Sequence, residues 1–326
     1  MRTPAQPSAA QLSRRLLLHA LPLATVVRLP DGATAAVELQ PPAPPPELAP
    51  PPPPSWPIPP LDYIDPLFGR LRNRYILLRP GETTFEAADI VDSNPINKQN
   101  SERGLTSKGR EQVARSVDAL RARGITSFTI YYDNGARATQ TADVISSMML
   151  IPRSQVEPEF RWLEARGLGE LEGTELREAA AKMRQLDAKD MDERAEPADD
   201  GTPADSVLEV FSRLRNTIAK IENSFGGGNF MIIGGDATVL SVFAAAACGA
   251  DLRTHNAYTL RQGEFFDLRE LVADVRAGRF EPRVGEQAPT TAAEIAEGRR
   301  RIREMGPRMF SDTDAGSWVL GPGVRR

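Results

Sequence analysis

The chain has 326 residues, with 40 basic and 44 acidic side chains and a formal net charge of −4. One cysteine cannot form an internal disulfide, and one cysteine with two histidines is too few for a zinc or iron–sulfur site, so we expect no metal and no cofactor. The acidic balance, without a block of Lys or Arg, argues against a nucleic-acid-binding protein.

Residues 1–36 combine the features of a targeting segment. Arg14 and Arg15 precede an apolar stretch (16–29) that is too short to span a bilayer, and small residues follow at 33–35. Twin arginines before an apolar run are typical of twin-arginine export signals, which thylakoid-lumen import also uses. A plain organelle transit peptide or a simple extension fits the same composition. We predict a plastid location (chloroplast, with the thylakoid lumen included), and the mitochondrion is the alternative.

Residues 37–72 have the composition of a linker. Thirteen prolines stand between residues 41 and 60. Because proline has no backbone N–H, such a run favours polyproline II and forms neither a helix nor a strand ladder. We interpret the segment as a stiff spacer, with a ligand for a proline-binding domain as the alternative.

From residue 73 onwards, strand and helix patterns alternate. Apolar runs predict strands over 74–79, 127–132 and 229–233, and an edge strand over 265–268. Apolar stripes and capping residues predict helices over 106–123, 136–149, 175–189, 206–223, 239–248 and 291–305. This alternation predicts an α/β domain with a mostly parallel central sheet and helices on both faces. We place the domain at 73–270 and a C-terminal helix and tail at 271–326.

Two further expectations concern burial. Cys248 lies in an apolar, alanine-rich helix and should be a buried structural thiol. The charged stretch 187–201 should form a surface loop.

Five segments, in chain order, resemble the histidine phosphatase superfamily. Residues 77–83 (LLRPGET) look like its Arg-His-Gly-Glu-Thr signature, and 105–112 (LTSKGREQ) are similar to its L-T-x-x-G-x-x-Q segment. Residues 137–142 (RATQTA) match R-A-x-Q-T-A, and 163–173 look like L-x-E … G-x-x-E-G. Residues 229–240 stand where the family has an apolar strand followed by Ser-His-Gly. The resemblance implies a three-layer, phosphoglycerate-mutase-like fold over roughly residues 73–270.

The resemblance also implies that the family's catalytic histidines are missing. The nucleophilic histidine, which becomes a phosphohistidine, corresponds to Pro80, and the second histidine corresponds to Gly235. A proline nitrogen has neither a usable lone pair nor an N–H, and glycine has no side chain. The two histidines of the chain lie elsewhere: His19 in the targeting segment, and His255 at an expected surface or helix-end position.

Two arginines survive at the family's phosphate-clamping positions. They are Arg79 and Arg137, and a planar guanidinium binds phosphate in bidentate fashion. The resemblance therefore implies a retained anion pocket. The alternative is that both arginines are structural, because Asp133 and Asp236 fall in the same strand-end loops and would neutralise them.

Glu164 is the nearest candidate for the family's general acid. Counting back from Gly173 places the acid at Ala165, so the register is one residue off. An acid without a nucleophile has nothing to protonate, so we interpret Glu164 as an exposed or ion-paired loop residue.

These features predict a phosphoglycerate-mutase-like protein that lacks the family's catalysis and acts as a phospho-ligand binder or scaffold. Its partner would be a phosphorylated small molecule or a protein, with no nucleic acid and no membrane span in the mature chain. One alternative is an active phosphatase or mutase that uses Asp236 as a substitute nucleophile, since aspartyl-phosphate chemistry exists in other folds. Another alternative is a structural subunit of an organelle complex.

Overall fold

The computed structural model describes residues 67–283 and 291–305, which all belong to one contact unit of the chain. The targeting segment and most of the proline-rich linker lie outside these ranges, so what the sequence says of them stays a prediction. None of the helices within the ranges combines the length and apolar content that crossing a bilayer requires.

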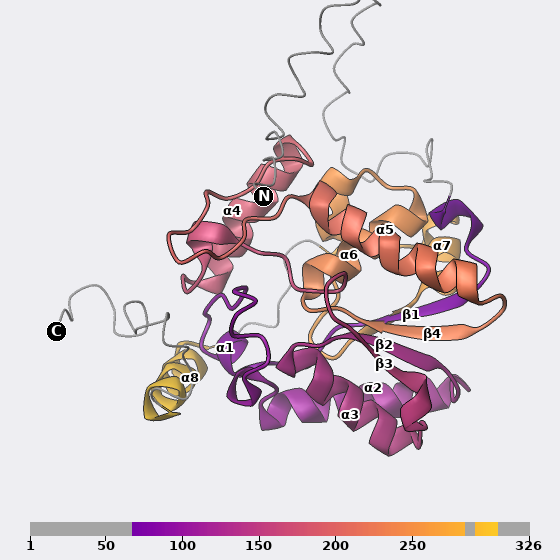
Figure 1. Ribbon diagram of the computed structural model, residues 1–326, viewed down its shortest axis with the longest axis horizontal. Coiled ribbons are helices and arrows are strands. Elements are labelled where there is room, and N and C mark those ends of the chain that lie inside the picture. Colours follow the sequence, from indigo (N-terminus) through magenta and orange to yellow (C-terminus); the bar gives the residue numbers. More distant parts are fainter. Residues whose placement is uncertain (1–66, 284–290, 306–326) are drawn as a thin grey trace, which may run out of the picture. The chain divides into compact units, whose positions relative to one another are not determined.

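A five-stranded sheet forms the centre, in the order β3-β2-β4-β1-β5. The strands are β1 (Arg74–Leu78), β2 (Thr129–Asp133), β3 (Val156–Glu159), β4 (Asn229–Ile233) and β5 (Phe265–Asp267). β1 pairs with β4, β4 with β2, and β2 with β3 in parallel, whereas β5 runs antiparallel to β1. The predicted α/β fold with a mostly parallel sheet is confirmed (Figure 1).

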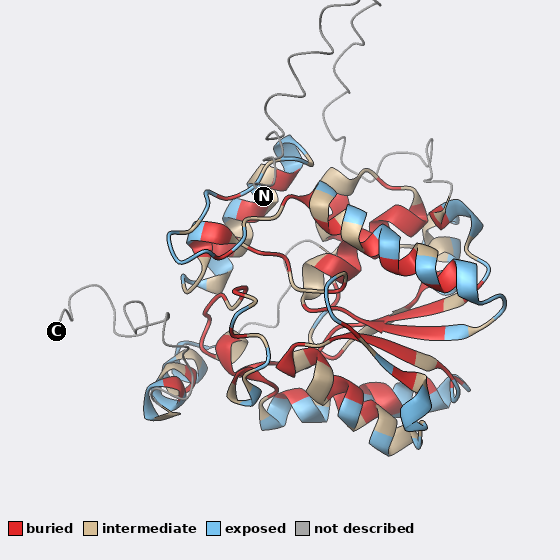
Figure 2. Ribbon diagram, viewed as in Figure 1, coloured by how far each residue is buried: buried red, intermediate tan, exposed pale blue. Residues whose placement is uncertain are grey.

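Helices cover both faces of the sheet. They are α1 (Thr84–Ala87), α2 (Ser107–Ala122), α3 (Ala136–Met149), α4 (Leu176–Lys189), α5 (Val207–Ser224), α6 (Ala237–Cys248), α7 (Leu268–Arg276) and α8 (Ala292–Met305). Helices α5, α6 and α7 lie on one face and α2 and α3 on the other (Figure 1). Successive β1 residues point to opposite faces, so Tyr75 and Leu77 join one core and Ile76 and Leu78 the other. Because both faces are covered, the three inner strands β1, β2 and β4 are mostly apolar and are buried along most of their length (Figure 2).

The structure adds the short helix α1, strand β3 and helix α7, which the sequence pattern does not predict. Strand β3 contains Pro158 and two glutamates, and it is tolerated because it lies at the edge of the sheet. Helix α7 follows β5 without a loop. It starts at Leu268, and the side chain of Asp267 caps it by accepting the Arg269 N–H. Because only Asp267 separates the apolar residues of β5 from the apolar first residue of α7, the sequence pattern does not mark where the helix starts.

Burial confirms one expectation and corrects part of two others. Cys248 is buried, and burial raises the pKa of its thiol to about 12. His255 is not a surface residue, since it is 1% exposed within the 3-10 turn Leu252–Ala257. The expected surface loop starts at residue 190 and not at 187, because Asp187 is buried in the last turn of α4; residues 190–201 form a largely exposed loop.

Two motif glycines let separate backbone segments touch. A Cβ on Gly81, just after β1, would lie well inside van der Waals contact with the Gly109 carbonyl, and a Cβ on Gly109 would overlap the Glu82 carbonyl. The Thr106 N–H donates to the Glu82 carbonyl at 2.9 Å, and the Thr106 hydroxyl caps α2 by accepting the Gly109 N–H. The loop after β1 is therefore held against the start of α2.

We predict that Gly81→Ala lowers the free energy of unfolding by about 1–3 kcal/mol, because the two backbones must separate. Gly226→Ala is the matched control, since a Cβ there meets nothing within 4 Å, and it should change stability by less than about 0.5 kcal/mol. Urea unfolding followed by circular dichroism measures both. Equal effects of the two substitutions would contradict the close approach.

Candidate functional site

A pocket of about 500 Å³ lies at the carboxyl ends of the parallel strands. Residues that follow β1, β2 and β4 border it, together with α1, α4 and the turn 252–257. Arg79 and Arg137 both line this pocket. The parallel strands bring the two arginines together although 58 positions separate them in the sequence (137 minus 79).

Arg79 is 4% exposed and is held on two sides. Its Nη1 donates to the Leu260 carbonyl at 2.8 Å and its Nη2 to Glu86 Oε1 at 2.7 Å. Glu86 belongs to a capping box at the start of α1, where its Oε2 accepts the Thr83 N–H at 2.9 Å. Burial opposes ionisation of Glu86, but Arg79 and the Thr83 N–H outweigh it and lower the pKa of this carboxyl. The guanidinium is thus neutralised by a carboxylate fixed in its own loop.

Arg137 is engaged in the same way by Asp92. Its Nη2 donates to the Asp92 carbonyl at 2.6 Å and to Asp92 Oδ2 at 3.1 Å. Asp92 Oδ1 accepts a second arginine, Arg103 Nη1, at 2.8 Å. Burial alone would lower the pKa of Arg137, but Asp92 and Glu86 raise it above its ordinary value. Asp92 therefore pairs with two arginines, Arg103 and Arg137, beside the carboxyl end of β2.

The carboxylates that pair with the two pocket arginines are therefore Glu86 and Asp92, and not the Asp133 and Asp236 that the sequence suggests. Asp236 lines the pocket, but it caps α6: its Oδ1 accepts the Val239 N–H at 3.0 Å and its Oδ2 the Arg166 N–H at 3.1 Å. Asp236 acts on Arg137 only through space.

Pro80 and Gly235 are packed against neighbouring backbone. Pro80 is buried, and its carbonyl accepts the Gly263 N–H at 3.0 Å. The Gly235 N–H donates to the Leu163 carbonyl at 2.8 Å, and a Cβ on Gly235 would overlap the backbone of Ala165. Neither is among the described residues that line the pocket. The chain at 163–165 occupies the space that a side chain at position 235 would need.

Glu164 and Asp133 line a second, neighbouring pocket of about 220 Å³. Glu164 pairs with Lys98, and its Oε2 lies 3.9 Å from Arg213 Nη1. Lys98 Nζ lies 4.0 Å from Asp133 Oδ1, an oxygen with no hydrogen-bond partner among the described residues. Burial raises the pKa of Asp133 to about 6, although Lys98 and Arg137 oppose this. Glu164 is thus an ion-paired loop residue outside the main pocket.

A buried polar chain forms part of the main pocket's wall. Ser241 Oγ lies 2.8 Å from His255 Nδ1, and His255 Nε2 lies 3.1 Å from Asp187 Oδ2. Arg166 completes the chain, because its Nη2 lies 2.8 Å from Asp187 Oδ1. Burial opposes ionisation of Asp187, but His255 and Arg166 outweigh it and lower the pKa of this carboxyl. No sequence signal points to this group, since Asp187, Ser241 and His255 come from three separate elements and Arg166 from a loop, with no shared motif.

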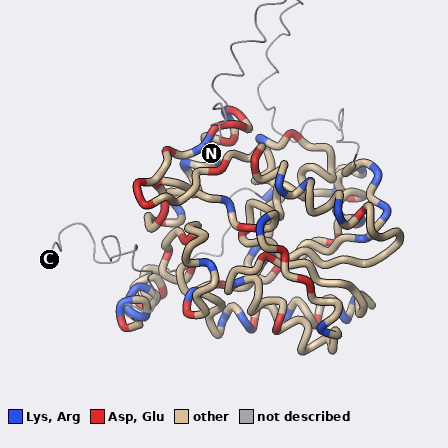
Figure 3. Tube along the Cα trace, in the orientation of Figure 1, with Lys and Arg blue, Asp and Glu red and all other residues tan. Residues whose placement is uncertain are grey.

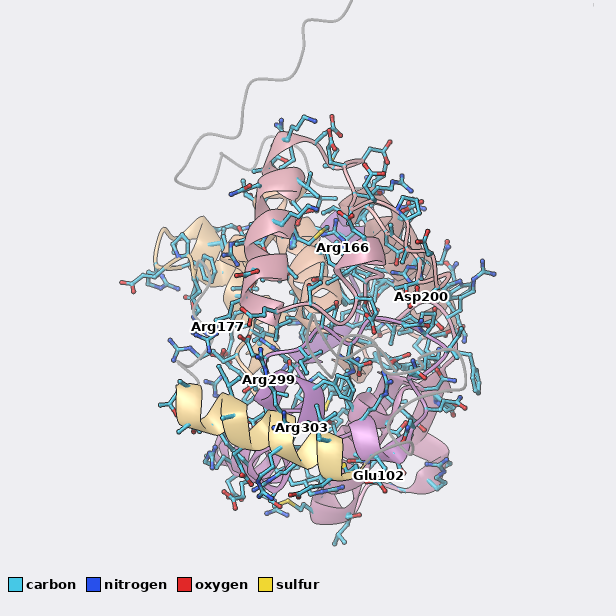
Figure 4. The ribbon with its side chains drawn as sticks, turned by 90° about the vertical axis from the view of Figure 1, so that its left-hand side faces the viewer. Glu102, Arg166, Arg177, Asp200, Arg299 and Arg303 are labelled. Carbon is cyan, nitrogen blue, oxygen red and sulfur yellow. The ribbon has the colours of Figure 1, made fainter. Side chains whose placement is uncertain are left out.

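The lining of the main pocket is electrically balanced. Figure 3 shows basic and acidic residues interspersed where the strand-end loops meet. Within the lining, Arg177 lies 3.4 Å from Asp89 Oδ2. Outside it, in a separate pocket beside α8, Arg299 donates to Glu175 at 3.1 Å (Figure 4). The charged lining residues are Arg79, Arg137, Arg166, Arg177 and Arg184, with Glu86, Asp89, Asp92, Asp187 and Asp236. Among the described residues, no three His, Cys, Asp or Glu side chains are grouped so that they could hold a metal ion.

The fold and the pocket define an α/β protein whose site lies where parallel strands end. The sequence model of the histidine phosphatase superfamily (branch 1) matches residues 75–269, and the chain belongs to that family. No curated protein sequence matches it significantly.

Similar solved structures include three family enzymes. One is a mycobacterial glucosyl-3-phosphoglycerate phosphatase complexed with VO3 (18% identity, 56% of this chain and 85% of that one, TM-score 0.42). Another is the alpha-ribazole phosphatase of Shigella flexneri (21% identity, 59% and 88%, TM-score 0.43). The third is a phosphoglycerate mutase of Bacillus anthracis (18% identity, 53% and 78%, TM-score 0.39).

The raised pKa of Asp133 predicts a pH dependence of stability. Its pKa is about 6 in the folded protein against 3.8 ordinarily, so the folded state binds this proton more tightly. Protonated Asp133 therefore stabilises the folded state fully below about pH 4, and this contribution is lost as the pH rises through 6. The free energy of unfolding falls by roughly 3 kcal/mol in total over this range. Asp133→Asn stays uncharged and should lack this loss.

Urea unfolding between pH 4 and 8 measures the difference between wild type and Asp133→Asn. Asp118→Asn, at an exposed position on α2, is the control and should follow the wild-type profile. Identical pH profiles for wild type and Asp133→Asn would show that the folded state does not perturb this carboxyl.

Proposed function

We propose that this histidine phosphatase superfamily member has no phosphomonoesterase or mutase activity and serves as a binding scaffold on the family's fold. The observation that carries the proposal is the engagement of both pocket arginines by internal carboxylates. Arg79 holds Glu86 at 2.7 Å and Arg137 holds Asp92 at 3.1 Å. An incoming phosphate would have to displace both carboxylates from their arginines, and Glu86 would then keep only its backbone N–H contact while Asp92 would keep only Arg103. Breaking two ion pairs that are largely shielded from water is unfavourable.

The positions after β1 and β4 support the same proposal. Pro80 offers no nucleophile, and the Ala165 backbone leaves no room for a side chain at Gly235. His255, the one histidine among the described residues, is bonded to Ser241 and Asp187 instead. Nothing in this arrangement supplies the phosphohistidine chemistry of the family.

A substitute nucleophile at Asp236 has less support. Both of its oxygens accept backbone N–H groups, from Val239 and from Arg166. A carboxylate that caps a helix and holds a loop loses both contacts if it attacks phosphorus. Phospho-ligand binding without turnover is disfavoured for the same reason as catalysis, because the arginines are occupied. We therefore favour a protein partner.

The purified protein should hydrolyse p-nitrophenyl phosphate and 3-phosphoglycerate no faster than a buffer blank, because Pro80 stands at the position of the phosphate-attacking histidine and the anion clamp is occupied. Arg79→Ala should give the same rate as wild type. Turnover by wild type that disappears in Arg79→Ala would contradict the proposal. Radiolabelled phosphate retained by wild type and lost in Asp236→Asn would establish the aspartyl route instead.

A further inference from the structure

We propose that Ser241, His255 and Asp187 form an acyl-transfer centre on the wall of the main pocket, and that its substrate class is small carboxylic esters. This goes beyond the proposed function, which concerns phosphoryl transfer only. Acyl transfer needs a hydroxyl nucleophile, a neutral imidazole and an orienting carboxylate, and these are different atoms from those that the phosphatase reaction uses.

The contacts fix the tautomer of the imidazole. Asp187 is ionised, and a carboxylate only accepts hydrogen bonds, so the 3.1 Å contact places the proton on His255 Nε2. Nδ1 is then an acceptor and faces the Ser241 hydroxyl at 2.8 Å. The longer contact of 3.3 Å between Nε2 and Asn256 Nδ2 is then not a hydrogen bond. Ser241 Oγ also lies 3.0 Å from the Thr238 carbonyl, a competing but longer acceptor contact.

Rigid elements hold the three side chains. Ser241 lies in the second turn of α6, His255 in the 3-10 turn that packs against α6, and Asp187 in the last turn of α4. Asp187 is anchored by Arg166, whose Nε donates to the Asp205 carbonyl at 2.8 Å. Each of the three proposed centre residues is 1% exposed, so the hydroxyl borders the pocket in a water-poor environment.

The pocket itself suits an ester with a modest apolar acyl group. Its volume of about 500 Å³ is that of a small-molecule site. Apolar side chains form much of its wall, from α1, the loop after it, the loop before the 3-10 turn Gly169–Leu171, and α4: Phe85, Ile90, Val91, Leu168, Leu176, Ala180 and Met183. Thr238 and Asn256 line the pocket on the same elements as Ser241 and His255, so their side chains are candidate donors to an oxyanion.

In the proposed reaction, Ser241 Oγ attacks the ester carbonyl carbon while its proton moves to His255 Nδ1. The carbonyl π electrons move to oxygen and give a tetrahedral oxyanion. The bond to the alkoxy oxygen then breaks, and the alcohol leaves with the proton from His255. Water attacks the acyl-serine with His255 again taking a proton, and collapse returns that proton to Ser241 and releases the carboxylic acid.

The test uses the full chain with a biotinylated fluorophosphonate and with p-nitrophenyl acetate. We expect a covalent adduct on the peptide that contains Ser241, found by mass spectrometry, and ester hydrolysis above the blank. Ser241→Ala should abolish the adduct and reduce hydrolysis by roughly 100-fold or more, and His255→Asn should do the same with Ser241 still present. Ser212→Ala, on the exposed side of α5, should change neither.

Wild type that is folded by circular dichroism but takes no label on Ser241 overturns the proposal by itself, whatever the variants do. Labelling that persists in a folded His255→Asn, judged by its melting temperature, also overturns it. Neither outcome depends on phosphomonoester turnover, so failure here is distinguishable from failure of the proposed function.

Discussion

A buried guanidinium stays charged and therefore needs a carboxylate beside it, and this constraint shapes the whole strand-end region. Three such pairs surround the main pocket: Arg79–Glu86, Arg137–Asp92 and Arg166–Asp187. Each pair joins a loop or helix to another part of the chain. The pairs therefore hold the pocket's walls together and also neutralise the charges of its arginines. Removing one partner would leave a buried charge alone, which typically costs about 3–5 kcal/mol.

Because of this constraint, the fold can bring the two arginines together without leaving them available to a phosphate. The sheet brings Arg79 and Arg137 to one pocket, as a phosphate clamp requires, but helix α1 and the loop after it supply each arginine with an internal carboxylate. The backbone at 163–165 lies against Gly235 and leaves no room for a side chain at that position. The same pocket keeps an apolar wall and a polar chain on α4, α6 and the turn 252–257. The proposed acyl chemistry uses different side chains from the arginine clamp, so it is compatible with the proposed lack of phosphoryl transfer.

Most of the fold could be predicted because buried parallel strands are continuous apolar runs and the helices carry capping residues such as Thr106 and Ser206. The meeting of Arg79 and Arg137 followed from strand-end topology. The partner Glu86 had a local signal, because Thr83 and Glu86 make a capping box. Asp92 had none, since it lies in an irregular loop. The burial of His255 was missed because its partners lie 14 and 68 positions away, beyond any sequence periodicity.

The central claim, that internal carboxylates occupy the arginine clamp, is tested most directly by calorimetric titration with inorganic phosphate and orthovanadate. Wild type should show no binding up to millimolar concentration, whereas Glu86→Gln should gain binding because it frees the charge of Arg79. Glu170→Gln, an exposed exchange on the same fold, should behave as wild type. Micromolar binding by wild type that is lost in Arg79→Ala would contradict the account.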